Sequence, residues 1–222
     1  MAEFAERGGC VILANDFDQG NSLLDDLLPG IRFSEEEVMD LSFEEDPWIV
    51  ACHSLSQDQL VQDIDRFELN QPAGLLGLAR TLANPAGSQN AQILAASSAM
   101  SWLDTHGDGE WGRDEARGPF PVLARIGLGQ GTIILLSDPS VLINQMMGEE
   151  GNQRLYDNLV SYLAGEGITR IYIDEEHHAT MDPSRPPQPS SDRPRTTRDS
   201  YSYGSSSPWQ SSSSTPGSGT AS

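Results

Sequence analysis

The apolar residues of this chain fall into short runs separated by turn residues, and these runs predict alternating strands and helices. Residues 10–15 form an apolar run between two glycines and an aspartate, which is typical of a buried strand. Residues 21–28 place leucines on one face of a short helix. Residues 48–52 are another strand candidate, and residues 67–69 and 91–95 fit two more.

The second half of the chain continues this alternation. Residues 121–128 and 132–136 predict a hairpin, because the Gly-Gln-Gly turn between them supplies the positive φ that tight turns need. Residues 141–147 and 152–164 predict helices, and residues 170–174 predict the last strand. Strands that alternate with helices favour a mainly parallel sheet, in which functional residues gather at the carboxyl ends of the strands.

The composition changes after residue 178. Residues 179–222 are rich in serine, proline, threonine, glycine and arginine, and they hold too little apolar surface to offset the entropy lost on folding. We therefore predict one folded domain, residues 1–178, followed by a disordered tail.

Acidic residues greatly outnumber basic ones. The chain has 33 Asp and Glu against 13 basic residues, all of them arginine, and its net charge is −20. The excess lies before residue 179, because the tail itself carries slightly more arginine than acid. Such a surface repels nucleic acid and anionic lipid, so we expect neither as a partner. The acid excess favours a halophilic, archaeal-like protein, and a G+C-rich genome that prefers arginine codons is the alternative.

Membrane and export signals are not found in the sequence. No run reaches the ~18 apolar residues that a membrane helix needs, and the acidic start lacks the apolar core of a signal peptide. The sequence therefore predicts a soluble, cytoplasmic protein.

Several segments, taken in order, resemble one known family. They are GGCVIL (8–13) with GNSLL (20–24), GPFPV (118–122) leading into GQGTII (129–134), SDPS (137–140) with Asn144, the pair Asp157 and Asn158, and DEEH (174–177). Together they resemble the domain of unknown function 4350 family of archaea and bacteria. The resemblance spans essentially residues 1–178.

The resemblance implies an α/β fold similar to the class I glutamine amidotransferases, a flavodoxin-like three-layer sandwich with a mainly parallel sheet and a β-hairpin. It also implies a protein partner, because members of the family tend to be encoded beside AAA-type ATPases. Members often carry membrane segments, and this chain departs from them there. The chain also opens at what resembles the end of the family's first helix, so we expect the first βα unit to be missing or the gene start to be misplaced.

The chemistry of an amidotransferase needs a cysteine on a tight strand-to-helix turn, activated by a histidine. Cys10 instead begins a strand. Cys52 precedes His53, but neighbours on a strand point to opposite faces of the sheet. We therefore expect a domain without the amidotransferase machinery.

One segment matches the spacing of a calcium-binding loop. Asp104, Asp108, Gly109 and Glu115 occupy positions 1, 5, 6 and 12 of an EF-hand-type loop, where carboxylate oxygens wrap a hard cation. His106 stands at position 3 and is a poor calcium ligand. The alternative is an acidic, glycine-rich surface loop that binds no ion.

A second cluster lies at the end of the last predicted strand. Residues 174–178 combine carboxylates with two histidines, which are the side chains that bind zinc or act as acid and base. Glu175 and His177, together with Asp138, are therefore candidate catalytic residues of a metal-dependent hydrolase. The alternative is a polar strand end whose side chains only cap and form hydrogen bonds.

A ligand site is the third hypothesis. Asp138 and Ser140 follow a strand and suit the cap of the next helix, which explains them without a ligand. If a pocket exists, six residues are expected to meet at the carboxyl edge of the sheet. They are Asp16, Asn21, Asp138, Asn144, Glu175 and His177.

The function that the sequence favours is a non-catalytic binding or scaffold module with a flexible tail. The metal-dependent hydrolase and a domain stabilised by calcium are the alternatives.

Overall fold

The fold is taken from a computed structural model, which describes residues 1–41, 47–78, 90–149 and 151–173. The chain divides into the units Met1–Ile171 and Tyr172–Ser222, and the elements below belong to the first. Its strands are β1 (Cys10–Ala14), β2 (Arg32–Asp40), β3 (Ile49–Cys52), β4 (Ser54–Leu55), β5 (Phe67–Asn70), β6 (Ala73–Leu76), β7 (Ala91–Ala96), β8 (Ser101–Leu103), β9 (Pro121–Leu128) and β10 (Gly131–Leu136). Its helices are α1 (Ala2–Glu6), α2 (Asn21–Leu27) and α4 (Asn152–Gly165), with short 3₁₀ helices η1 (Phe17–Gly20), η2 (Gln59–Val61), η3 (Pro139–Leu142) and η4 (Met146–Gly148).

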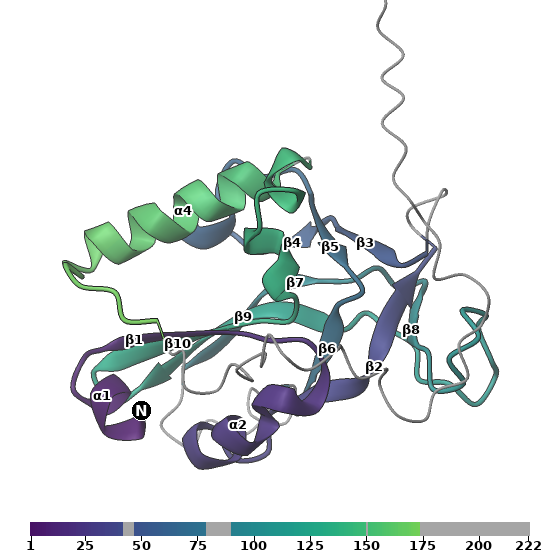
Figure 1. The fold of residues 1–222 in the computed structure, drawn as a ribbon, viewed down its shortest axis with the longest axis horizontal. Helices are drawn as coiled ribbons and strands as arrows, with labels where there is room; N and C mark the ends of the chain where they lie inside the picture. The colour runs from purple at the N-terminus through teal and green to yellow at the C-terminus, as the bar shows by residue number, and fades with distance from the viewer. Residues whose placement is uncertain (42–46, 79–89, 150, 174–222) are drawn as a thin grey trace, which may run out of the picture. The chain divides into compact units, whose positions relative to one another are not determined.

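The largest sheet has the strand order β1-β10-β9-β7-β4 (Figure 1). β1 runs parallel to β10, whereas β10–β9, β9–β7 and β7–β4 are antiparallel. Two smaller sheets have the orders β6-β2-β8 and β3-β5, and both are antiparallel. The prediction of a mainly parallel, flavodoxin-like α/β sandwich is therefore wrong. Short turns such as the one between β9 and β10 reverse the chain, whereas parallel neighbours need long crossover connections.

The main sheet packs apolar side chains on both of its faces. One face forms a core with α4, through residues such as Ile134, Leu136 and Leu155. The other face forms a core with α2, through residues such as Leu24 and Leu135. Figure 1 shows α4 and α2 on opposite sides of the sheet. This arrangement explains why β1 is apolar throughout and β10 is apolar from Ile133 to Leu136, since both faces of these strands meet a core.

Two local predictions fail. Residues 141–147 form not one helix but parts of η3 and η4, because Ile143 between them adopts an extended backbone. Residues 170–173 lie outside any strand, and Ile171 is 74% exposed. The predicted helices at 21–28 and 152–164 and the hairpin of β9 and β10 are confirmed.

Candidate functional site

The carboxyl ends of β1 and β10 lie side by side. Ala14 is in register with Leu136, and the backbone N–H of Asn15 donates to the carbonyl of Leu136 at 3.0 Å. Asp16 and Asp138 follow these strand ends. Burial is the main cause that raises the pKa of Asp16 to about 7, and the negative charges of Asp138 and Glu37 contribute to that rise. The structure thus brings two of the six predicted ligand residues into electrostatic contact.

Asp138 is fully buried and serves as a cap. One carboxylate oxygen accepts from the backbone N–H of Asn70 at 2.7 Å, and the other accepts from the N–H and the hydroxyl of Ser140. Burial raises the pKa of Asp138, and these hydrogen bonds act against that rise. The cap fixes the start of η3.

Asn21 also has a structural partner. Its side-chain amide donates to the carbonyl of Phe33 at 2.9 Å, and its carbonyl oxygen accepts from the N–H of Phe33 at 2.8 Å. Asn144 is exposed between η3 and η4. Glu175 and His177, with the rest of residues 174–178, lie outside the described residues. A common cleft for all six residues therefore stays a prediction.

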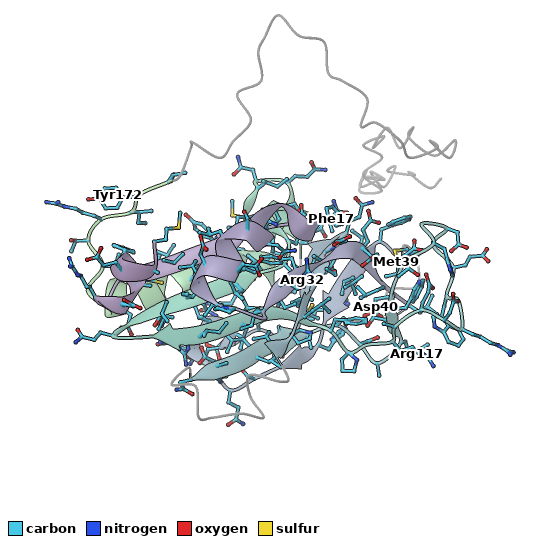
Figure 2. The ribbon with its side chains drawn as sticks, turned by 90° about the horizontal axis from the view of Figure 1, so that it is seen from below. Phe17, Arg32, Met39, Asp40, Arg117 and Tyr172 are labelled. Atoms are coloured by element: carbon cyan, nitrogen blue, oxygen red, sulfur yellow. The ribbon has the colours of Figure 1, made fainter. Side chains whose placement is uncertain are left out.

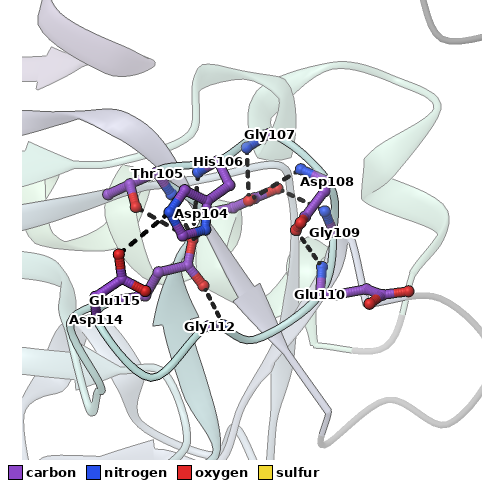
Figure 3. A network of polar contacts seen from close by, with 10 residues as sticks. All are labelled: Asp104, Thr105, His106, Gly107, Asp108, Gly109, Glu110, Gly112, Asp114 and Glu115. Atoms are coloured by element: carbon purple, nitrogen blue, oxygen red, sulfur yellow. Dashed lines mark hydrogen bonds and ion pairs between the residues drawn. The ribbon is translucent and has the colours of Figure 1, made fainter.

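Asp104 organises the loop that matches the calcium-loop spacing (Figure 3). One of its oxygens accepts from the backbone N–H groups of Gly107 at 2.8 Å and Asp108 at 3.2 Å, and the other accepts from Gly109 at 2.9 Å. Asp104 is only 6% exposed. A buried carboxylate that accepts three backbone donors stabilises this turn through its own hydrogen bonds.

Glu115 closes the same loop from its other end. One oxygen accepts from the N–H groups of Thr105 at 2.8 Å and His106 at 3.3 Å, and the second accepts from Gly112 at 2.7 Å. The ring of His106 lies within 3.5 Å of Glu115 and within 3.3 Å of Asp114. The two carboxylates at the ends of the loop are therefore engaged by the loop itself.

The described part of the chain contains no cluster of metal-binding side chains that would support the zinc or calcium hypothesis. No group of three His, Cys, Asp or Glu side chains there is arranged to hold an ion. Calcium binding through Asp104, Asp108 and Glu115 stays a prediction, but the structure gives two of these side chains another use. The loop instead displays Trp111, which is 44% exposed and lies under the guanidinium of Arg117 at 4.5 Å.

This loop is fixed to the end of the β2–β8 sheet. Trp102 of β8 pairs with Met39 of β2 and bridges to Arg117. Figure 2 shows Met39, Asp40 and Arg117 at the same end of the domain. The carboxylate of Asp40 accepts from the N–H and hydroxyl of Ser98 at 2.8 and 2.6 Å, which anchors the turn before β8.

The open edge of β1 is a feature of the fold that the sequence did not predict. β1 stands at the end of the main sheet, and the described strands provide it with a partner on one side, β10. All five of its residues are half-buried, whereas Ile134 and Leu135 of β10 are at most 1% exposed. The unbroken apolar run CVILA was the available signal, but it suits a central strand as well as an edge strand.

The hydrogen bonds at the two ends of β1 show which backbone groups face outward. The N–H of Thr132 donates to the carbonyl of Gly9, and the N–H of Asn15 donates to β10. The backbone groups of alternate residues point to the same side of a strand. The odd-numbered residues of β1 therefore face β10, and Cys10, Ile12 and Ala14 direct their N–H and C=O groups toward the open edge.

Solved structures of other proteins are similar to this chain over most of its length. The mmIFT52 N-terminal domain matches 77% of this chain and 70% of its own, with a TM-score of 0.50 and 13% identity. The cytoplasmic protein STM1381 from Salmonella typhimurium LT2 matches 72% of this chain and 58% of its own, with a TM-score of 0.44 and 12% identity. The first similarity concerns the fold alone. No curated protein matches this chain.

No helix in the described residues has the length and apolar character to cross a membrane. The family profile described as Domain of unknown function (DUF4350) matches residues 1–160. Because that match covers more than half of the sequence, the chain belongs to the DUF4350 family.

Proposed function

We propose that this domain is a protein-binding module that takes an extended polypeptide segment onto the open edge of β1. The observation that carries the proposal is the outward-facing backbone of Cys10, Ile12 and Ala14 on a strand that is apolar on both faces. An unpaired strand edge is a template for another strand, which gains affinity from main-chain hydrogen bonds.

The side chains that flank this edge define the class of partner. Cys10, Ile12 and Ala14 pack toward the core under α4, and Val11 and Leu13 pack toward the core under α2. A strand added beside β1 therefore meets apolar surface on both faces, and it needs apolar, preferably β-branched, residues at successive positions. The acidic charge of the chain favours basic residues at the ends of that segment.

The proposal is tested by selecting peptides from a displayed library of random decapeptides on the full chain. We expect apolar, β-branched peptides, and we expect Ile12→Pro to weaken their binding at least about tenfold. Proline removes an outward N–H there and is tolerated on an edge strand. Failure to select such peptides, or binding that Ile12→Pro leaves unchanged, would show the proposal to be wrong.

The matched control is Leu13→Pro, whose lost N–H faces β10. Leu13→Pro is expected to lower the unfolding midpoint strongly, whereas Ile12→Pro lowers it less, because it loses side-chain packing but no hydrogen bond to β10. If Ile12→Pro also fails to fold, Ala14→Pro replaces it, because the N–H of Ala14 faces the same open edge.

A further inference from the structure

We propose that residues 168–171, which follow α4, form a strap that closes over the open edge of β1 as a parallel strand. This inference rests on the proposed function, because the strap covers the same edge and so regulates access to it. Four observations support it: where α4 ends, which way the chain runs there, which residues follow, and how exposed they are.

The end of α4 lies beside the start of β1. The hydroxyl of Tyr162, in the last turn of α4, lies 3.4 Å from the hydroxyl of Thr132 at the start of β10. Burial raises the pKa of Cys10 to about 11, and the charge of Glu166 just after α4 contributes, which places Glu166 near the first residue of β1. Figure 1 shows this end of α4 on the same side as α1, which leads into β1.

The chain is redirected at this point. The N–H of Ile168 donates to the carbonyl of Leu163 at 3.0 Å, and Gly167 between them has a φ of 72°. This is the usual way in which a glycine ends a helix and lets the chain leave in a new direction. A segment that leaves the helix here starts at the amino end of β1. It can then run along the open edge of β1, parallel to both β1 and β10. The order β10, α4, strap is that of a β–α–β unit.

The residues of the strap suit a strand better than a solvent-exposed turn. Residues 168, 169 and 171 are isoleucine, threonine and isoleucine, all β-branched. The side chain of Ile171 is 74% exposed in the open arrangement, and pairing with β1 would bury part of this apolar surface. Arg170 brings positive charge to an edge whose amino end lies near Glu166. At about 3.3 Å per residue, four residues span most of β1.

Disulfide trapping tests the strap in the full chain. Cysteine is introduced singly at positions 168, 169 and 170, which lie nearest the amino end of β1 in the closed arrangement, and the cross-link to the native Cys10 is followed with oxidised glutathione at mildly alkaline pH. Side chains of a paired strand alternate between the faces of the sheet, and neighbouring strands place Cα atoms within disulfide range. We therefore expect one position to react at least about tenfold faster than its neighbours, in monomers, and Cys10→Ser to abolish the product.

Three outcomes would overturn the strap. Equal rates at all three positions would indicate an untethered segment that collides at random. Disulfide-linked dimers would indicate that a second copy takes the edge. No cross-link at any position would show that the segment does not reach β1.

A second measurement separates this inference from the proposed function. Arg170→Pro removes a strap N–H and should raise the affinity for selected peptides, by about tenfold if the strap is closed nine-tenths of the time. If peptides bind in a manner that depends on Ile12 but no alternating cross-link is found, the strap is wrong and the function stands. If the cross-link pattern is found but peptides do not bind even to Arg170→Pro, the proposed function is wrong and the strap stands.

Discussion

Asp16 is a polar residue placed where the fold does not favour its charge. One of its carboxylate oxygens is buried and has no hydrogen-bond partner among the described residues, and Asp138 and Glu37 add negative charge nearby. Its pKa in the folded protein, about 7, lies above its ordinary value of 3.8. The folded state therefore binds this proton more tightly than the unfolded chain does. The stabilisation is fully present below about pH 4 and is lost as the pH rises toward 7.

The first prediction follows from the upward shift of the Asp16 pKa. Asp16→Asn removes the ionisation, so the free energy of unfolding should fall less between pH 5 and pH 8 than it does in the native chain. Because Asp16 is only half-buried, we expect a gain of about 1 kcal/mol at pH 8, well below what the full pKa shift implies. Thermal unfolding at both pH values measures it. Asp108→Asn, on an exposed loop, is the control, and an Asp16→Asn protein that is less stable at pH 8 would contradict the prediction.

Asn152 shows how one side chain can join a helix to a strand edge. It is the first residue of α4 and is 1% exposed. Its amide exchanges two hydrogen bonds with the backbone of Glu68 in β5, at 2.8 and 2.9 Å, and donates a third to the carbonyl of Met146. Asn21 makes the same two-bond contact from the first residue of α2 to Phe33 of β2. Both asparagines thus form hydrogen bonds to buried backbone groups of a strand.

The second prediction concerns this contact. Asn152→Ala should reduce the free energy of unfolding by about 2–4 kcal/mol, because it removes the three hydrogen bonds of a buried side chain. Denaturant unfolding measures the change. Gln153→Ala, one position along on the exposed side of α4, is the matched control and should change stability by less than about 0.5 kcal/mol. Equal effects of the two substitutions would show that the amide contact contributes nothing.

At the scale of elements, the sequence predicted those helices and turns whose signals lie close together along the chain. The helix of residues 152–164 and the hairpin around Gly129 were found, because their signals lie within one stretch of chain. β2 was missed because three successive glutamates hide its apolar ends, and because β6 and β8, its partners, lie far along the chain. Residues 141–147 do not form one helix, since Val141 and Met146, the buried residues of η3 and η4, are five positions apart and cannot share one helical face.

The candidate site could be predicted from the sequence only in part. Asp16 and Asp138 could be placed together because each directly follows an apolar strand run. The open edge of β1 could not be found, since an apolar run does not reveal which strands lie beside it. The spacing of Asp104, Asp108 and Glu115 predicted a calcium loop or an acidic surface loop, and sequence cannot tell whether Asp104 binds an ion or three backbone amides.

The third prediction decides between those two uses of the loop. Asp104→Ala should lower the free energy of unfolding by about 2–3 kcal/mol, since three backbone donors lose their acceptor. We expect the same loss in EDTA and in added calcium, because the carboxylate acts on the loop itself. Thermal unfolding in both conditions measures it. A calcium-dependent rise in the midpoint of the native chain that vanishes in Asp104→Ala would establish the metal site instead.

At the scale of the whole molecule, the acidic charge predicts a dependence of stability on salt. A net charge of −20 destabilises the compact state through self-repulsion, and salt screens it within a Debye length of about 10 Å at 0.1 M and 3 Å at 1 M. The midpoint of thermal unfolding should therefore rise between those concentrations, by about 2–4 °C for each kcal/mol recovered. Glu35→Gln with Glu36→Gln, which removes two charges from the glutamate run of β2, should flatten that rise. NaCl and KCl should act alike if screening is the cause. A midpoint that stays constant, or that falls with salt, would show that the acidic surface is compensated in the folded state.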